Sequence, residues 1–275
     1  MSQAHRREIS RGERFEFGAN WTRFLSGLND LRIAEAKASL RRMLGVESLI
    51  GKTFCDVGSG SGLFSLAARM LGAKVHSFDY DPQSVACTRE LQQRYFPGDK
   101  DWIVEEGSVL DTAYLSRLGQ FDVVYSWGVL HHTGKMWEAL GNVAPLVAGS
   151  GGRLCVAIYN DQGWISRYWA AVKRLYVGVP LLRWPMLLAH APYLFGLRWI
   201  VRALSGRLVL DRGMSLWHDT VDWIGGYPFE VARPEAVFRF FQDRGLRLYD
   251  LKTCAGRQGC NEFVFLRGPF DPCAA

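Results

Sequence analysis

The sequence predicts an α/β fold built on a doubly wound parallel sheet, and three observations support this prediction. A short apolar strand ending at Val57 runs through the glycine-rich turn 58–62 into a helix with an apolar face. Strand and helix patterns then alternate as far as Tyr159. Two strands with alternating apolar residues, 246–251 and 262–266, follow near the end and predict an antiparallel pair in the same sheet.

The composition is that of an ordinary globular protein. Of the 275 residues, 48% are hydrophobic and 22% are charged, close to the averages for globular domains. The six cysteines show no C-x-x-C pair and no metal-ligand spacing, so we expect reduced thiols and no metal site. The polar amino terminus lacks the apolar core of a signal peptide, which predicts a cytoplasmic protein.

The net charge of +6 comes from one segment. Residues 161–212 contain eight Lys and Arg against two Asp, whereas the rest of the chain balances at 25 basic and 25 acidic residues. The same segment holds eight aromatic residues: Trp164, Tyr168, Trp169, Tyr176, Trp184, Tyr193, Phe195 and Trp199. The function of the positive charge therefore belongs to this segment.

The first 50 residues precede the first core strand and predict a helical cover. Apolar residues spaced for one helix face predict a helix over 31–44, which ends near Gly45. Trp21 lies before this helix and has two interpretations. It is either a lid residue over the functional site or a side chain packed on the core.

The following elements are expected in regular order. A second strand over 73–78 leads to a helix with Asp81 as N-cap and Pro82 in its first turn. Further strands are expected over 102–104, 121–126 and 153–159. An insertion over 160–232 then interrupts the alternation, and Pro234 begins the next helix. Its length predicts a substrate cover.

The glycine turn favours one class of cofactor. Its spacing is G-x-G-x-G, not the G-x-G-x-x-G of a dinucleotide site, and Asp56 stands two residues before the first glycine. A carboxylate there repels a pyrophosphate but attracts an ammonium and a sulfonium, which favours S-adenosylmethionine over NAD. Asp79, at the end of the second strand, is placed to accept two hydrogen bonds from a ribose diol. The alternatives are a turn without a ligand, and acids that serve only as helix caps.

The string 54–62 resembles motif I of the class I S-adenosylmethionine-dependent methyltransferases, and over 52–159 the chain is similar to those of ubiquinone and menaquinone biosynthesis. This resemblance implies a Rossmann-like seven-stranded sheet in the order 3-2-1-4-5-7-6, with S-adenosylhomocysteine as the product. It implies four parts: a helical cover (1–50), a cofactor-binding core (51–159), a helical lid insertion after strand 5 (160–232) and a closing helix and strand pair (233–275).

The same resemblance and the convergence of parallel strand ends assign the cofactor contacts. Ser108 and Val109 occupy the adenine positions, where aspartate is commoner than serine and Asp111 is the alternative. The loop after the fourth strand is expected to border the methyl group. The full set is Asp56, Gly58, Ser59, Gly60, Gly62, Asp79, Tyr80, Ser108, Val109, Ser126, Trp127, Gly128 and Trp21.

Methyl transfer is an in-line displacement, so an acceptor hydroxyl needs alignment and a group that takes its proton. Histidine suits this step near neutral pH. The candidate catalytic residues are His131, His218 and Asp219. The candidate substrate contacts are His132, Trp164, Asp222, Trp223 and Glu230. A metal bound by these histidines with Asp219 or Asp222 lacks the short ligand spacing of known sites.

The aromatic and basic insertion has three interpretations. It is a folded lid of amphipathic helices, expected over 164–176 and 194–204, that lines a substrate pocket. It is a peripheral membrane or lipid-binding element; its longest uncharged run, the 14 residues 184–197, is too short to span a bilayer. Or it is an RNA-binding surface, although no recognisable RNA-binding module is present.

The sequence therefore predicts a methyltransferase that acts on a small-molecule acceptor, at an oxygen atom, with no DNA partner. Two alternatives remain open: an RNA methyltransferase that uses the basic insertion, and a non-catalytic scaffold with a cofactor-binding fold.

Overall fold

A single seven-stranded sheet organises the computed structural model, which describes residues 3–149, 151–191, 196 and 223–268. The strands are β1 (Thr53–Val57), β2 (Lys74–Asp79), β3 (Trp102–Glu106), β4 (Val123–Trp127), β5 (Arg153–Tyr159), β6 (Leu246–Lys252) and β7 (Cys260–Arg267). Their order is β3-β2-β1-β4-β5-β7-β6. β7 runs antiparallel to β5 and β6, and the other pairs are parallel. The predicted fold and strand order are confirmed.

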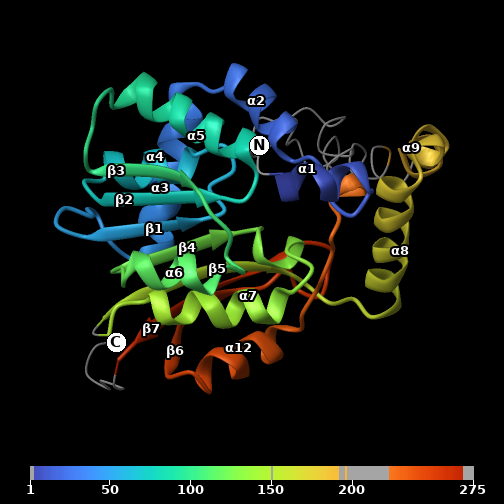
Figure 1. The fold of residues 1–275 in the computed structure, drawn as a ribbon. Helices are drawn as coiled ribbons and strands as arrows, with labels where there is room; N and C mark the ends of the chain where they lie inside the picture. Colours follow the sequence, from blue (N-terminus) through green and yellow to red (C-terminus); the bar gives the residue numbers. More distant parts are fainter. Residues whose placement is uncertain (1–2, 150, 192–195, 197–222, 269–275) are drawn as a thin grey trace.

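Helices cover both faces of the sheet (Figure 1). One face packs against α3 (Asp30–Leu44), α4 (Leu63–Met70) and α5 (Pro82–Tyr95), and the other against α6 (Thr112–Leu118), α7 (Met136–Val143) and α12 (Pro234–Gln242). Short 3-10 turns, η1 (Leu130–His132) and η2 (Ala144–Leu146), flank α7. In β1, Phe54 joins one core and Cys55 the other, because successive side chains of a strand alternate between the faces.

The amino-terminal cover contains α1 (Gln3–Ser10), which the sequence analysis did not foresee, and α2 (Gly18–Ser26). The expected helix over 31–44 is α3. The Asn29 side chain accepts the Arg32 N–H at 3.1 Å, and Gly45 ends the helix with a φ of 60°. In Figure 1, α1 lies over the carboxyl ends of the central strands.

The described part of the insertion stands beside the sheet. It includes α8 (Trp164–Gly178), η3 (Pro180–Leu182) and α9 (Arg183–Ala191) (Figure 1). Buried side chains of α8 and α9 form a third apolar cluster with Ile224. The helix expected over 194–204 lies outside the described residues, apart from Gly196. Among the described helices, none combines the length and the apolar character needed to cross a bilayer.

Candidate functional site

The glycine turn lies between the carboxyl ends of β1 and β2, next to the point where the strand order reverses. Gly58, Gly60 and Gly62 have positive φ angles of 80°, 54° and 79°. A Cβ on Gly58 would stand 2.3 Å from Val129 Cγ1, and one on Gly62 would stand 2.8 Å from the Thr88 Cα. Both the backbone conformation and the close packing therefore require glycine here.

The backbone N–H groups of this turn are bonded within the chain. Gly58 and Ser59 donate to the Phe78 carbonyl at 2.9 and 3.1 Å. Gly62 donates to the Ser59 carbonyl at 2.8 Å, and Gly60 donates to Asp79 Oδ2 at 2.9 Å. Since these donors are used, the turn offers few of the N–H groups with which a dinucleotide loop binds a pyrophosphate.

Asp79 ends β2 and connects the turn to the next loop. Its Oδ1 accepts the Asp81 N–H at 2.9 Å, while its Oδ2 accepts that of Gly60. Burial raises the pKa of Asp79 to about 6, although the two backbone donors favour the charged form. Each carboxylate oxygen can accept a further hydrogen bond, so the group can hold hydroxyl donors while it fixes the turn.

Asp56 belongs to a buried chain of hydrogen bonds. The Trp102 indole donates to Ser77 Oγ at 2.9 Å, Ser77 donates to Ser65 Oγ at 2.8 Å, and Ser65 donates to Asp56 Oδ2 at 2.5 Å. Burial raises the pKa of Asp56 to about 7, which the Ser65 hydrogen bond only partly offsets; the nearby Asp79 raises it further. Its side chain therefore supports α4 from within the core, and any influence on a ligand acts through its charge.

The amino-terminal cover closes over the glycine turn. Trp21 of α2 lies against Gly60, where a Cβ would stand 3.1 Å from the indole. Asp81 is buried and caps two helices: Oδ1 accepts the Gln83 N–H of α5 at 2.9 Å, and Oδ2 accepts the Gly18 N–H of α2 at 2.8 Å. One side chain thus joins the cover to the core.

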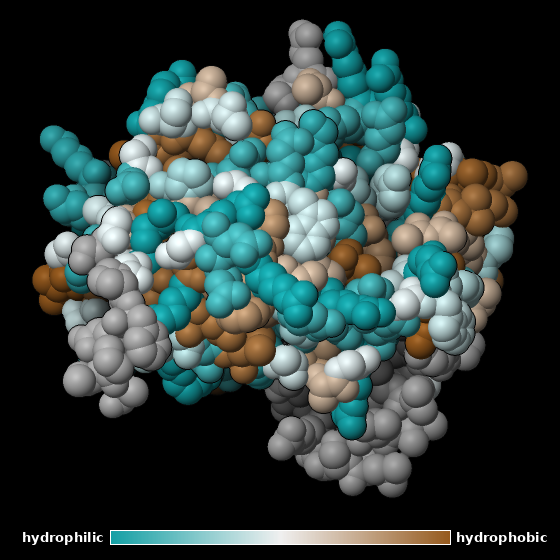
Figure 2. All heavy atoms as spheres, turned by 90° about the horizontal axis from the view of Figure 1, so that it is seen from below, coloured by the Kyte–Doolittle hydropathy of each residue, from teal (hydrophilic) through white to brown (hydrophobic). Residues whose placement is uncertain are grey.

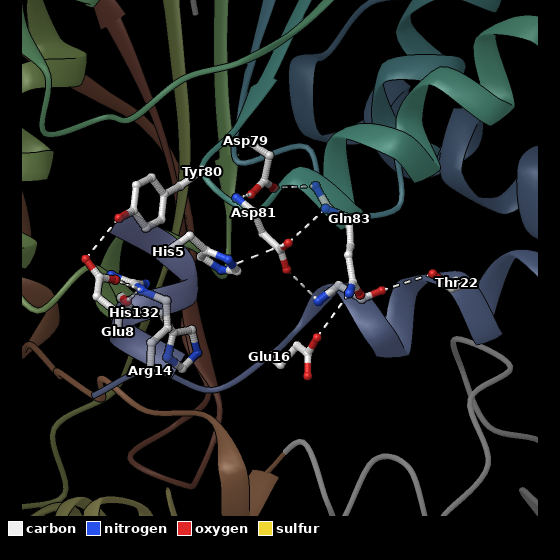
Figure 3. Close-up of polar contacts among 12 residues, drawn as sticks. His5, Glu8, Arg14, Glu16, Thr22, Asp79, Tyr80, Asp81, Gln83 and His132 are labelled. Atoms are coloured by element: carbon white, nitrogen blue, oxygen red, sulfur yellow. Dashed lines mark hydrogen bonds and ion pairs between the residues drawn. The ribbon is translucent and has the colours of Figure 1, made fainter. Parts of the chain in front are cut away.

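Figure 3 shows a second connection between the cover and the strand ends. Glu8 accepts hydrogen bonds from Tyr80 at 2.9 Å and from Arg14 at 2.6 Å. Arg14 also donates to the His132 carbonyl at 3.0 Å, and its guanidinium lies over the Tyr80 ring. Burial and the Glu8 hydrogen bond raise the pKa of Tyr80 to about 12. The Tyr80 hydroxyl is therefore committed to Glu8 in this structure.

The remaining predicted cofactor positions lie along the same edge. The Ser59 hydroxyl pairs with Thr88 at 2.9 Å, so this side chain points to α5. Ser108 Oγ accepts the Leu110 N–H at 3.2 Å, whereas Val109 is buried in the core. The Ser126 hydroxyl donates to the Val57 carbonyl at 2.9 Å and ties β4 to β1.

Trp127 and Gly128 follow at the end of β4. The Trp127 ring stacks on Tyr125 and Phe64. Gly128 has a φ of 71°, and among the described residues no atom lies within 4 Å of the position of its missing Cβ. This glycine therefore leaves open space at the carboxyl end of β4, as a ligand approaching the backbone requires.

His131 and His132 have different environments. His131 is fully buried, and its Nδ1 accepts the Tyr159 N–H at 3.3 Å. Burial and the neighbouring His132 and Lys173 hold the pKa of His131 well below its ordinary value. His131, a predicted catalytic residue, therefore has no lone pair that a methyl acceptor can reach. His132 Nδ1 lies 2.6 Å from the Pro228 carbonyl and donates to it, which leaves Nε2 as the acceptor nitrogen.

An aromatic wall borders these histidines. Tyr159 lies 4.0 Å from His131 and 5.4 Å from Trp223, between ring centroids. Lys173 is buried beneath the wall, 4.3 Å from the Trp223 ring and 4.8 Å from the Phe229 ring, and donates to the Trp223 carbonyl. A hollow lined by Tyr159, Trp169 and Trp223 lies here beside α8, and its volume of about 10 Å³ has room for about one water molecule.

Two predicted substrate contacts, Trp164 and Glu230, differ in position: Trp164 is exposed, whereas Glu230 lies beside His131 and donates its N–H to the His131 carbonyl at 2.9 Å. Trp164 begins α8 and is 72% exposed, so its side chain lines no described part of the site. Glu230 Oε2 accepts the Met136 N–H at 2.9 Å at the start of α7, where a carboxylate favours the helix dipole. Burial raises the pKa of Glu230. Glu230 therefore stabilises a helix end. His218, Asp219 and Asp222 lie outside the described residues.

Sequence reasoning missed Glu8, Arg14, Tyr159 and Lys173. Glu8 and Arg14 sit in a polar segment with no motif, and only the three-dimensional contact with Tyr80 reveals their role. Tyr159 ends β5, and this position, where the ends of parallel strands converge, is a signal that the sequence does contain. Within the described residues, no group of three His, Cys, Asp or Glu side chains is arranged to hold a metal ion.

The geometry is that of a class I methyltransferase, a Rossmann-like sheet with a glycine turn and an acid at the end of the second strand. Residues 55–154 match the family model described as a methyltransferase domain. This match, over about a third of the chain, confirms the broad resemblance to the S-adenosylmethionine-dependent methyltransferases. The ubiquinone and menaquinone subtype stays a prediction.

Curated relatives match over short segments. The chain is 38% identical to the ribosomal protein L11 methyltransferase of Methylococcus capsulatus over 69 residues, which are 25% of this chain and 24% of that protein. The corresponding protein of Prochlorococcus marinus is 32% identical over 112 residues, 40% of this chain and 36% of that protein. The chain thus spans about a quarter of the length of the first of these relatives.

Solved structures share the fold over nearly the whole chain. The magnesium protoporphyrin IX methyltransferase of Synechocystis PCC 6803 with bound SAH has a TM-score of 0.56 at 14% identity, covering 95% of this chain and 100% of that chain. An O-methyltransferase family protein from Burkholderia thailandensis has a TM-score of 0.53 at 16% identity, covering 96% of this chain and 67% of that chain. The N-methyltransferase NodS of Bradyrhizobium japonicum with SAH has a TM-score of 0.52 at 14% identity, covering 92% of this chain and 100% of that chain.

Proposed function

We propose that this chain is an S-adenosylmethionine-dependent methyltransferase that acts on a small-molecule acceptor at an oxygen atom. The observation that carries the proposal is the hydrogen bonding of the glycine turn. The turn gives its N–H groups to Phe78, Ser59 and Asp79 rather than leaving them for a phosphate. A cationic ligand without phosphates fits such a site better than a dinucleotide does.

The site residues fit this cofactor. Asp79 has acceptor capacity for two ribose hydroxyls, and Gly128 leaves space for a ligand along the backbone. Trp21 covers the turn at Gly60 and would exclude water from it. When bound, the cofactor supplies an electrophilic methyl group on a sulfonium. Asp79, with a pKa of about 6, is mostly charged at neutral pH and supplies negative potential that favours this positive charge.

We place the acceptor hydroxyl at His132, whose ring contacts Tyr159 of the aromatic wall. The Pro228 carbonyl fixes the tautomer, so that Nε2 keeps its lone pair. Burial lowers the pKa of His132 to about 3, which keeps the ring neutral at physiological pH. A base this weak orients the hydroxyl by a hydrogen bond, and the proton released on methyl transfer passes on to solvent. His218, Asp219 and the substrate role of Asp222 stay predictions.

A small acceptor fits the aromatic wall. Tyr159, Trp223 and Phe229 present ring faces and edges beside His132, which suits a planar or partly apolar molecule. The structural relatives include both O- and N-methyltransferases. The choice of oxygen rests on His132, because a neutral hydrogen-bond acceptor is suited to hold a hydroxyl donor.

Transfer of a labelled methyl group tests this proposal. The full chain is incubated with labelled S-adenosylmethionine and, separately, with a small-molecule extract and with bulk RNA. We expect label in the small-molecule fraction, its loss in Asp79→Asn and its retention in Asp243→Asn, which changes an exposed acid beyond α12. Label confined to RNA would support the basic-insertion alternative. Cofactor binding without any transfer to either fraction would support the scaffold alternative.

A further inference from the structure

The helices α8 and α9 and the turn between them expose large apolar side chains. Six of them, here called the lid patch, are Trp164, Tyr168, Leu175, Leu181, Trp184 and Leu188. Their exposed fractions reach 86% for Leu181, 72% for Trp164 and 70% for Leu188. Hydrophobic residues reach the surface at the right-hand edge of Figure 2, the side on which Figure 1 has α8 and α9. A contiguous group of this kind marks an interaction surface.

Helical spacing arranges the patch and its charges in parallel stripes. With 3.6 residues per turn, Trp164, Tyr168 and Leu175 fall on one side of α8. The exposed Arg167 and Arg174 fall on the adjoining stripe. The opposite side of the helix carries the buried Trp169, Val172 and Tyr176 that anchor it to the rest of the protein.

The two lid helices hold the patch together as one unit. The Tyr168 hydroxyl of α8 lies 2.7 Å from His190 Nε2 of α9. His190 Nδ1 in turn bonds the Met186 carbonyl at 2.7 Å. Trp184 and Leu188 lie one turn apart on α9, and Arg183 beside them is exposed. The patch is therefore a prearranged surface with apolar and cationic groups together.

Acidic residues are absent from this part of the sequence. No Asp or Glu occurs between Asp161 and Asp211. A second copy of the chain would therefore bring arginines against arginines without carboxylates to pair with them. RNA would satisfy the arginines but would leave Leu175, Leu181 and Leu188 without an apolar partner. A bilayer with anionic headgroups offers phosphates and hydrocarbon at adjacent depths.

We propose that the lid patch binds the surface of an anionic phospholipid bilayer. Leu181, Trp184 and Leu188 enter the boundary between headgroups and acyl chains, while Arg167 and Arg174 bind lipid phosphates. The contact is peripheral, since no described helix is suited to span the membrane. This contact brings the aromatic wall close to lipids, because α8 carries both the lid patch and the buried Lys173, which lies against the Trp223 ring of that wall.

Vesicle cosedimentation of the full chain tests the proposal. The vesicles are phosphatidylcholine alone, or phosphatidylcholine mixed with phosphatidylglycerol. We expect sedimentation with the mixed vesicles and its loss at high salt. Leu181→Ser lowers the partition coefficient about tenfold, because a large apolar group no longer enters the bilayer. Arg167→Gln lowers it about fivefold, the effect of about 1 kcal/mol per basic residue.

Matched controls change the same residue types elsewhere. Leu31→Ser alters a leucine of α3 that is 75% exposed, and Arg239→Gln alters an exposed arginine of α12. Both should sediment like the wild type. No binding to mixed vesicles would overturn the proposal, and so would equal losses in patch and control variants. Light scattering that shows a patch-dependent dimer, or RNA binding that needs the patch, would likewise overturn it if vesicles are not bound.

Discussion

Asp79→Asn separates the cofactor role of this residue from its structural role. The amide keeps one acceptor oxygen, so only one of the N–H groups of Gly60 and Asp81 keeps its partner. An unpaired N–H in this half-buried place costs about 1–3 kcal/mol. Against this, burial raises the carboxyl pKa from 3.8 to about 6, so the charged form destabilises the folded protein at pH 8 by roughly 3 kcal/mol. The two effects oppose each other and are similar in size.

The free energy of unfolding of the apoprotein should therefore change little, whereas cofactor affinity should fall steeply. Charge-assisted hydrogen bonds to the ribose contribute about 2–3 kcal/mol, so the dissociation constant of S-adenosylhomocysteine should rise about 30- to 150-fold. Wild-type affinity should also weaken as the pH falls through 6, because Asp79 takes up a proton. The variant should lack this pH dependence.

Isothermal titration and urea unfolding measure the two quantities on the same preparation. Asp243→Asn, at an exposed position, is the control for loss of one negative charge. Binding of S-adenosylhomocysteine by folded Asp79→Asn within about threefold of the wild type would exclude this cofactor role. A wild-type pH dependence of binding in the variant would exclude it as well.

Three further predictions concern the framework of the site. Gly62→Ala should lower the free energy of unfolding in urea by at least about 2 kcal/mol, because its Cβ would stand 2.8 Å from a backbone atom. The control Gly98→Ala has a similar φ of 73° and open space around the Cβ, so it should lower this free energy by about 1 kcal/mol. Equal losses in the two variants would contradict this prediction. Asp81→Ala should lower the free energy of unfolding by about 1–2 kcal/mol and expose residues 3–26 to limited proteolysis, because Asp81 caps two helices. An unchanged cleavage pattern would show that Asp81 does not hold the amino-terminal cover on the core. Burial raises the pKa of Asp56 to about 7, so the folded protein takes up a proton there and should become more stable as the pH falls from 8 to 5. Asp56→Asn should remove this contribution. Identical pH profiles of the unfolding midpoint in the variant and the wild type would exclude this role of Asp56.

The sheet was predictable because its signals are local. Each signal depends only on neighbouring residues: the glycine spacing marks the end of β1, Asp81 and Pro82 mark the start of α5, and the apolar runs mark the other strands. The position of Asp79 followed from strand order, since parallel strand ends converge. By contrast, α1 is mostly polar, and its buried residue is the polar His5.

The acceptor side was less predictable because its residues act through distant contacts. The adjacent His131 and His132 look alike in sequence, yet one is sealed behind Tyr159 and the other bonds the carbonyl of Pro228, 96 positions away. Trp164 matches a pocket residue by type but faces outward on α8. Side-chain direction on a helix depends on which face the core takes, and composition does not determine that face.

The most direct test of the central claim is a titration of the wild-type chain with S-adenosylhomocysteine and, in parallel, with NAD. The donor-poor glycine turn and the acceptor capacity of Asp79 for a ribose predict that S-adenosylhomocysteine binds at a single site, whereas NAD does not. Binding of NAD without S-adenosylhomocysteine would contradict the account.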